Sequence, residues 1–407
     1  MARQVYAHYM VGLTDNQALS QWETDITQAK EALIDGFALN IGPVDAWTDT
    51  QLALAYQAAE SLDFDLFISF DQSSTTNIWT VESVASYVNA YKDSSAQVLV
   101  DGKPMVSTFE GPGWSDNWAT VREQTGGIFL VPDWSSLGPD GISGMSSVID
   151  GAFSWSAWPG PGATQMTTDQ DVLYQTALGK GTTEEKPYMM GVSPYFYVNL
   201  PEWSKNWYSS SESLWYDRWQ QVLEVDPAYI EIITWNDFSE SSYISDIVPA
   251  QIVSGAEVYV DGFDHSAMRA VLPYFITAYK AGAKNVDLTT DETAIAWYRT
   301  TSATLGADGG TVWGQSGSES ASVGARDVVS IITITIDDTE VQLDIGGTSQ
   351  SFVANGTNRV NYFEVPFNGA LGDVSLTMNG LSSTGPAIVN TLPATGYVNF
   401  NAAVIQV

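Results

Sequence analysis

Residues 5–42 begin with VYAHYMVG, continue at residue 18 with ALSQWETDITQAKEAL, and end at residue 35 with DGFALNIG. The first and last of these segments are short apolar runs of strand length, whereas the middle segment carries apolar residues at helical spacing. A strand, a helix and a second strand in this order predict one repeating unit of a parallel β-sheet.

The same alternation recurs over the first 300 residues. Further helical patterns lie at 49–62, 81–92, 213–225 and 267–280. Eight apolar runs are expected to be strands, namely 5–12, 35–42, 66–71, 105–110, 128–134, 152–158, 188–197 and 229–235. Eight strands alternating mostly with helices predict an α/β fold, a (β/α)8 TIM-type barrel over residues 1–300. A doubly wound open sheet is the alternative, and it is less favoured because no glycine-rich phosphate turn follows the first run.

The composition changes after residue 300. Residues 301–324 are rich in Gly, Ser, Thr and Ala, which is typical of a linker or surface loop. Residues 325–407 contain short runs of strand character, with Gly346-Gly347 and Asn379-Gly380 as hairpin turns. They predict a C-terminal β-sandwich that acts as an accessory domain, either as structural support or as a weak glycan contact. The runs are 328–336, 341–345, 350–353, 360–365, 374–378 and 397–405.

The overall charge limits the partners. The chain carries 48 acidic and 15 basic residues, a formal net charge of −33. Such a surface repels nucleic acids and acidic membranes, whereas a neutral polymer such as a polysaccharide is not disfavoured. No apolar run approaches the roughly 18 residues of a membrane span. We therefore expect no nucleic-acid partner and no membrane partner; a polysaccharide substrate is compatible with this charge, and we expect the protein to be a monomer.

The chain has no cysteine and two histidines, His8 and His265. This composition excludes disulfides, thiolate catalysis and a histidine-rich metal cluster. We expect neither a cofactor nor a metal, although carboxylates alone leave a calcium site open.

Acidic residues stand at the ends of several predicted strands. In a parallel barrel the chemistry takes place where the strands end, at the carboxyl face. A single acid at such a position is more often a helix cap or a solvated loop residue, but several on one rim indicate a catalytic or binding site. His8 ends the first strand at the same rim. The acids are Asp71, Glu110, Asp133, Asp237 and Glu240.

Paired carboxyl groups suit the hydrolysis of a glycosidic bond, which needs one group to protonate the leaving oxygen and another to activate water or to attack the sugar. Asp237 and Glu240 are three residues apart, but the spacing does not fix whether the pair inverts or retains configuration. A Cys nucleophile and a Gly-x-Ser-x-Gly elbow are both missing. Aromatic rings could stack on the sugars, with core packing as the competing explanation, at Trp134, Trp155, Trp158, Tyr195 and Tyr197.

Several segments resemble glycoside hydrolase family 71, the fungal endo-α-1,3-glucanases or mutanases. The resemblance covers nearly the whole chain, and WNDFSES at 235–241 is its most specific part. The segments are AHYMVG (7–12), GFALNIGP (36–43), FISFDQ (67–72), VSPYFYVN (192–199), ITWNDFSESSYI (233–244) and YVDGFDH (259–265).

The resemblance implies hydrolysis of α-1,3-glucan with inversion by a secreted enzyme that acts on cell walls or mutan. It places the catalytic pair at Asp237 and Glu240 and a third acid at Asp71. We expect Glu240 to be the general acid and Asp237 the general base, while Asp71 orients the water or the sugar. Trp235 and Asn236 of the same motif are expected to contact substrate. Related mutanases carry cysteines that this chain lacks, which affects stability more than chemistry.

Two other interpretations stay open. One is a catalytically inactive glycan-binding or cell-wall protein, although both acids of the 235–241 motif are present. The other is a barrel glucanase that acts on a different linkage.

Overall fold

The computed structural model describes residues 3–287, 291–306, 310–315 and 317–407. The chain divides into two compact units, each assembled from several segments. The first unit comprises Met1–Ala157, Thr167–Val192 and Glu224–Trp235, and the second comprises Trp158–Met166, Ser193–Leu223 and Asn236–Val407.

The first unit is built around a parallel sheet. Its eight parallel strands are β1 (Gln4–Met10), β2 (Gly36–Ile41), β3 (Asp65–Asp71), β5 (Lys103–Phe109), β6 (Phe129–Leu130), β7 (Ala152–Ser154), β8 (Tyr188–Val192) and β11 (Tyr229–Ile232). The strands pair in the order β6-β5-β3-β2-β1-β11-β8-β7, and β4 (Leu99–Val100) adds an antiparallel edge to β5. Isolated parallel bridges join Asp133 to both Phe109 and Phe153, so that the pairings run around a ring. This connection argues against an open sheet.

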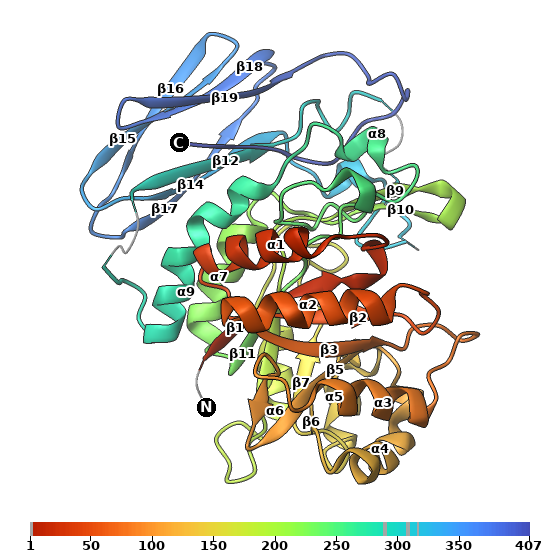
Figure 1. Ribbon diagram of the computed structural model, residues 1–407. Helices are drawn as coiled ribbons and strands as arrows, with labels where there is room; N and C mark the ends of the chain where they lie inside the picture. The colour runs from red at the N-terminus through yellow and green to blue at the C-terminus, as the bar shows by residue number, and fades with distance from the viewer. Residues whose placement is uncertain (1–2, 288–290, 307–309, 316) are drawn as a thin grey trace. The chain divides into compact units, whose positions relative to one another are not determined.

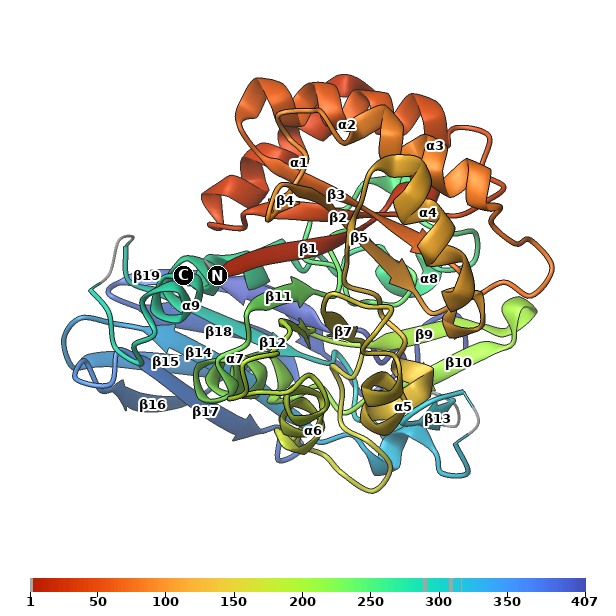
Figure 2. The ribbon, with the colours of Figure 1, turned by 90° about the horizontal axis from the view of Figure 1, so that it is seen from below.

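Helices connect these strands. In Figures 1 and 2, α1, α2 and α3 lie side by side along the strands β1, β2 and β3. Helix α1 buries Trp22, Ile26 and Ala29 at spacings of four and three residues, which is the apolar stripe that its sequence predicts. The helices are α1 (Leu19–Glu31), α2 (Thr48–Leu62), α3 (Val81–Tyr91), α4 (Trp118–Thr125), α5 (Gly138–Gly144) and α6 (Asp169–Ala177).

Strand burial explains why the predicted runs are nearly continuous in apolar character. The five central residues of β1 and of β3, and all six of β2, are buried, as expected for parallel strands covered on both faces. The predicted α/β class is confirmed. The predicted run 188–197 is wrong as one strand, because it ends as β8 at Val192 and resumes as β9 (Tyr197–Leu200) in another sheet.

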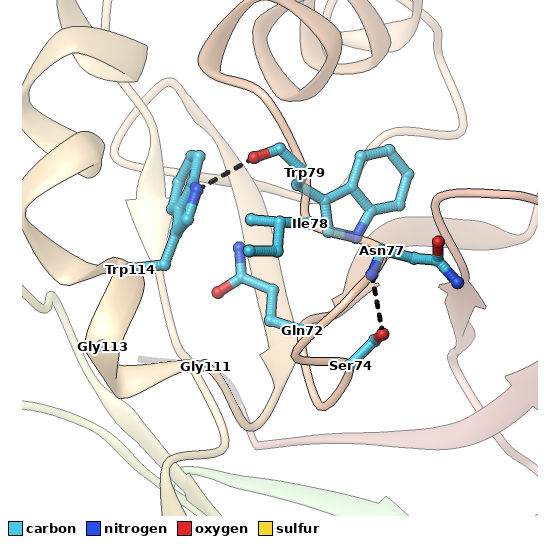
Figure 3. Close-up of a pocket in the computed structure, with 8 residues that line it drawn as sticks. All are labelled: Gln72, Ser74, Asn77, Ile78, Trp79, Gly111, Gly113 and Trp114. Atoms are coloured by element: carbon cyan, nitrogen blue, oxygen red, sulfur yellow. Dashed lines mark hydrogen bonds between the residues drawn. The ribbon is translucent and has the colours of Figure 1, made fainter.

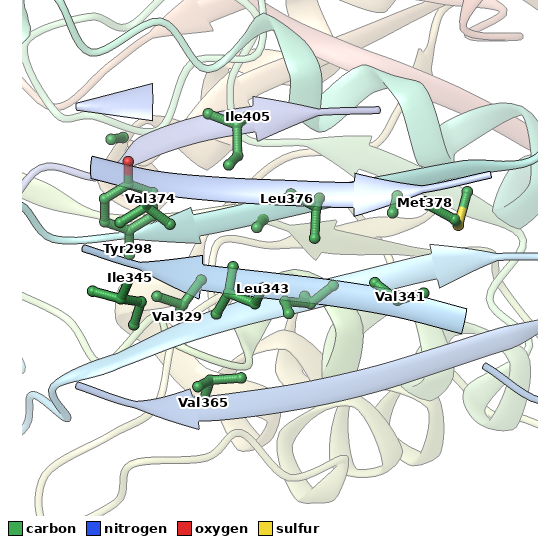
Figure 4. Packing of buried hydrophobic residues seen from close by; sticks show 14 of the residues in the cluster. Tyr298, Val329, Val341, Leu343, Ile345, Val365, Val374, Leu376, Met378 and Ile405 are labelled. Carbon is green, nitrogen blue, oxygen red and sulfur yellow. The ribbon is translucent and has the colours of Figure 1, made fainter. Parts of the chain in front are cut away.

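The second unit contains two four-stranded antiparallel sheets. One has the order β17-β14-β12-β20 and the other β16-β15-β18-β19. Buried side chains of both sheets form one apolar cluster, which includes Val329, Leu343 and Leu376 (Figure 4). The strands are β12 (Thr293–Tyr298), β14 (Val328–Ile334), β15 (Thr339–Ile345), β16 (Thr348–Ala354), β17 (Val360–Pro366), β18 (Gly372–Met378), β19 (Leu381–Ile388) and β20 (Ala403–Gln406).

A smaller sheet of this unit pairs β9 with β10 (Lys205–Tyr208) and β10 with β13 (Thr311–Val312). Strand β13 lies in the stretch 301–324 that we predicted to be a linker. Residues 307–309 and 316 of that stretch lie outside the described residues. The remaining helices of the chain are α7 (Leu214–Val225), α8 (Glu257–Val260) and α9 (Leu272–Ala281). Across the described part of the chain, no helix combines the length and the apolar character needed to cross a membrane.

Candidate functional site

Asp71 is the last residue of β3, at the carboxyl end of the parallel sheet. One of its oxygens, Oδ1, accepts hydrogen bonds from the backbone N–H of Ser73 (2.9 Å) and from the Ser73 hydroxyl (2.7 Å). The indole N–H of Trp79 donates to the backbone carbonyl of Asp71 at 2.8 Å. Burial raises the pKa of Asp45, which follows β2, and the charge of Asp71 raises it further.

Glu110 and Asp133 follow β5 and β6. Glu110 has a φ of +55°, and its two carboxylate oxygens accept hydrogen bonds from the backbone N–H and the hydroxyl of Ser136. Asp133 is fully buried and accepts a hydrogen bond from the backbone N–H of Ser135 at 3.0 Å. Burial raises the pKa of Asp133 to about 7, and the charges of Glu110 and Glu231 act in the same direction against the Ser135 hydrogen bonds.

A buried histidine–glutamate pair lies in the same unit. Contrary to the expectation from the sequence, His8 lies within β1 and not at its end, because the strand continues to Met10. Nδ1 of His8 is 2.7 Å from Oε1 of Glu231, on β11. The edge of Trp155 meets the His8 ring, with the centroids 4.9 Å apart. Burial raises the pKa of Glu231, and His8 opposes this shift. Among the described residues, Oε2 of Glu231 has no hydrogen-bond partner. The first unit thus holds Asp71, Glu110 and Asp133 at or after strand ends and a buried acid, Glu231, within β11.

Asp237 and Glu240 lie in the second unit, in the loop that follows β11. Oδ1 of Asp237 accepts hydrogen bonds from the backbone N–H of Glu240 (3.0 Å) and from the Ser239 hydroxyl (2.7 Å). Nζ of Lys205, the first residue of β10, is 3.0 Å from Oε1 of Glu240. Asp237 is 8% exposed, and the Glu240 side chain is 18% exposed. The turn therefore orients both carboxyl groups while leaving Glu240 accessible.

Further contacts hold this loop. The Tyr259 hydroxyl donates to the Ser239 carbonyl at 2.6 Å, and the Tyr197 N–H donates to the Glu240 carbonyl at 3.0 Å. Burial raises the pKa of Tyr259, and the charges of Asp237 and Glu240 add to it. The Asn236 side-chain amide donates to Oε1 of Gln251 at 2.9 Å. Asn236 thus has a structural partner beside its predicted substrate contact.

Most of the predicted stacking rings are packed inside the protein. The Tyr195 and Tyr197 hydroxyls donate to the Phe400 and Val398 carbonyls, and the Trp235 ring lies 5.0 Å from Phe37. A ring without an exposed face cannot stack on a polysaccharide, so we correct the stacking set to the partly exposed Trp155 and Trp158. The expected stacking rings excluded by burial are Trp134, Tyr195 and Tyr197, and Trp235, expected to contact substrate, is buried as well.

Both units thus offer carboxyl groups that are held by short hydrogen bonds and can donate or accept protons, the basis of general acid–base catalysis. Within the described ranges, no group of three or more His, Asp or Glu side chains is placed to hold a metal ion.

Comparison with known proteins decides the family. The model of a family described as glycosyl hydrolase family 71 matches residues 1–407. The chain belongs to glycosyl hydrolase family 71. The resemblance drawn from the sequence is thereby confirmed.

Curated relatives agree with this membership. The chain is 37% identical over 421 residues to a Schizosaccharomyces pombe protein named glucan endo-1,3-alpha-glucosidase agn1, covering 98% of this chain and 93% of that protein. It is 38% identical over 305 residues to a mutanase of Penicillium rubens, covering 74% of this chain and 66% of that protein.

Solved structures share the fold at low identity. A family 99 endo-alpha-mannosidase from Bacteroides thetaiotaomicron has a TM-score of 0.54 at 12% identity, covering 69% of this chain and 98% of that one. A family 2 glycosyl hydrolase from Bacteroides cellulosilyticus has a TM-score of 0.51 at 11% identity, covering 94% of this chain and 45% of that one. These neighbours support a mixed α/β, barrel-like fold.

Four residues of this family 71 chain were missed by the sequence reasoning. Asp45 lies in the segment GFALNIGPVDAW, four residues after β2 ends, where an acid after a strand was a usable signal. Glu231 is the one acid within the apolar run YIEIITW, and such burial calls for a partner. Lys205 and Tyr259 reach the Glu240 loop from distant positions in the chain, which no local pattern indicates.

Proposed function

We propose that this protein hydrolyses α-1,3-glucosidic bonds within α-1,3-glucan and inverts the configuration at the cleaved sugar. One observation carries the proposal. The family 71 match spans the whole chain, and its relatives are named as endo-1,3-α-glucanases and mutanases. The acid-bearing segment WNDFSES, which supplies Asp237 and Glu240, lies within the match.

The chemistry needs a proton donor and a proton acceptor. Glu240 acts as the general acid and protonates the glycosidic oxygen while the bond from the anomeric carbon breaks. Asp237 acts as the general base and takes a proton from the water that attacks that carbon from the opposite face. Asp71 orients the water or the sugar. Water adds across the bond, and the new reducing end is the β-anomer.

The ion pair between Lys205 and Glu240 bears on this assignment. The Lys205 ammonium, 3.0 Å away, stabilises the ionised form of Glu240. It therefore disfavours the protonated form that a general acid needs. Because the Lys205 side chain is 44% exposed, solvent screening weakens this effect. Glu240 can therefore act as the acid at acidic pH, and the opposite assignment of the two roles predicts a different pH profile.

The architecture supports a division of labour. We propose that residues 1–300 form a (β/α)8 barrel that carries catalysis, and that residues 301–324 connect it to a C-terminal β-sandwich at residues 325–407. Strand β12, at Thr293–Tyr298, already pairs with β14 and β20, so the accessory sheets take one strand from before the boundary. The enzyme is proposed to be secreted as a monomer that acts on cell-wall glucan or mutan.

The decisive assay compares linkages. Wild-type protein is incubated with alkali-extracted α-1,3-glucan, starch and laminarin, and released reducing sugar is measured. We expect release from α-1,3-glucan alone, and loss of general acid or base in Glu240→Gln or Asp237→Asn should reduce turnover by about 10²–10⁴-fold. Release from starch or laminarin but not from α-1,3-glucan would refute the proposed substrate, and binding without release would refute the activity.

A further inference from the structure

The loops that follow β3 and β5 enclose a cavity of about 230 Å³ (Figure 3). The cavity adjoins Asp71, since Gln72 is the next residue and the Trp79 indole donates to the Asp71 carbonyl at 2.8 Å. All of its lining belongs to the first unit. The lining residues are Gln72, Ser74, Asn77, Ile78, Trp79, Gly111, Gly113 and Trp114.

The lining is uncharged. None of these eight residues is acidic or basic, although the chain carries 48 acidic and 15 basic residues. Two indole rings and Ile78, which is 63% exposed, provide apolar surface, while two amides and a hydroxyl provide donors and acceptors. A ligand with apolar faces, several hydroxyl groups and no charge matches this combination, and a sugar unit has these properties.

The Gln72 amide gives a more specific indication. Both its oxygen and its nitrogen are buried, and neither has a hydrogen-bond partner among the described residues. Gly111, at φ +89°, leaves room for this side chain, since a Cβ there would stand 2.2 Å from the Gln72 amide oxygen. Buried amides are normally hydrogen-bonded. A hydroxyl-bearing ligand would supply both a donor and an acceptor to Gln72.

The two indole rings are fixed in place. Trp114 donates its N–H to the Trp79 carbonyl at 3.1 Å, as Figure 3 shows, and Trp79 donates to Asp71. Phe70 packs against Trp79, and Trp118 against Trp114, in T-shaped pairs with ring centroids 5.1 Å and 5.0 Å apart. Both rings are therefore held by hydrogen bonds and ring packing before a ligand arrives, which lowers the entropy that binding must overcome.

We propose that this cavity is a subsite that binds one neutral glucosyl unit of the substrate chain. Its volume lies below the roughly 300–1,000 Å³ of sites for drug-sized ligands, so one sugar fits better than a run of sugars. That the sugar is glucose rests on the proposed function. That the ligand is a neutral sugar rests on the lining residues alone.

The test measures binding separately from turnover. Gln72→Met and Ile78→Ser are each combined with Glu240→Gln, and titration calorimetry follows binding of α-1,3-linked glucose oligosaccharides of two to eight units, a range of about one to several subsites. We expect each variant to weaken binding of the longer oligosaccharides by about 5–20-fold and to leave disaccharide binding unchanged. The matched control is Ile336→Ser, since Ile336 is 50% exposed and lies outside the cavity.

Thermal denaturation separates a ligand role from a structural one. Because Gln72 makes no side-chain hydrogen bond among the described residues, Gln72→Met should keep the wild-type melting temperature while it weakens binding. Equal affinity of both variants and wild type for the long oligosaccharides would overturn the subsite, whether or not the wild type cleaves glucan. Weakened binding without any cleavage by wild type would support the subsite and refute the proposed function.

Discussion

Asp133 is a fully buried acid whose Oδ1 is hydrogen-bonded to Ser135 and whose Oδ2 has no partner among the described residues. Burial and the charges of Glu110 and Glu231 raise its pKa to about 7. In the unfolded chain the same carboxyl group has a pKa of about 3.9. Between these values the native state keeps a proton that the unfolded state has lost, so folding stability falls as pH rises from about 4 to 7.

Replacing Asp133 by Asn should therefore stabilise the protein at neutral pH. The amide keeps the Ser135 contact and removes the cost of ionising a buried acid. We expect the melting temperature of the variant to match wild type near pH 4 and to exceed it by about 2–5 °C at pH 7.5, measured by calorimetry. A difference that is constant across this range would show that Asp133 does not titrate there.

Lys205 offers a test of which acid donates the proton. Removing the positive charge beside Glu240 makes that carboxyl group easier to protonate. The size of the effect is the interaction energy of a partly exposed ion pair. If Glu240 is the general acid, Lys205→Met should move the alkaline limb of the kcat/KM profile upward by about 0.2–0.7 pH unit. Lys30→Met, which changes an exposed lysine on α1, is the control. A shift of the acidic limb instead would assign Glu240 as the base.

Individual residues differ in how far sequence could predict them. Strand-end acids such as Asp71 and Glu110 lie where the strand pattern places them, since a carboxylate directly after an apolar run marks the end of the strand. For the five expected stacking rings, the sequence did not predict which are exposed. Residue type does not separate the buried Trp134 and Tyr195 from the partly exposed Trp155. Exposure depends on partners far away in the sequence, such as the Phe400 carbonyl that Tyr195 contacts.

Among the elements, β12 is anchored by a buried ion pair at its end. Arg299, directly after β12, is 2% exposed and lies 2.7 Å from Glu212 and 2.9 Å from Asp327. Glu212 also accepts hydrogen bonds from the Tyr208 hydroxyl and the Arg326 N–H. Arg299 is therefore compensated by two carboxylates within the second unit.

Glu212→Gln should destabilise the fold by roughly 3 kcal/mol, because it leaves a buried guanidinium with one carboxylate partner. Chemical denaturation measures the change. The control is Asp246→Asn, which removes the carboxylate that pairs with Arg269. Because the Asp246 side chain is 52% exposed, this substitution should cost less than about 1 kcal/mol. Equal effects of the two substitutions would mean that burial of the Glu212 pair has no energetic consequence.

The turn between β15 and β16 tests the role of close packing. Gly346 and Gly347 have φ of +58° and +91°, but a Cβ on Gly346 would stand 1.8 Å from the Leu371 carbonyl, whereas one on Gly347 meets nothing within 4 Å. Gly347→Ala should cost about 1–2 kcal/mol for the left-handed conformation, and Gly346→Ala should cost clearly more. Equal unfolding free energies of the two variants would contradict the steric argument.

The sequence predicted elements best where a local pattern is complete. The helices at 49–62 and 81–92 and the hairpin turns at Gly346-Gly347 and Asn379-Gly380 agree with the structure, since spacing and positive φ are local properties. Strand β19 was missed because its sequence LSSTGPAI contains Gly and Pro, and cross-strand pairing with β18 determines it. Tertiary pairing likewise makes β13 a strand in a stretch of loop composition.

At the scale of the whole molecule, family and substrate class follow from the sequence more readily than domain boundaries do. The WNDFSES segment and the net charge of −33 both favour a neutral glycan substrate. The two compact units, however, interleave along the chain, with residues 158–166 and 193–223 inserted among segments of the first unit. Such an arrangement depends on long-range contacts, which composition changes along a chain do not report.

The central claim is that Asp237 and Glu240 hydrolyse α-1,3-glucan by direct attack of water. Proton NMR of a fresh digest tests it most directly, because the anomeric signal of each new reducing end records the direction of attack. We expect wild type to release the β-anomer first and Glu240→Gln to release almost none. First appearance of the α-anomer, or undiminished release by Glu240→Gln, would contradict it.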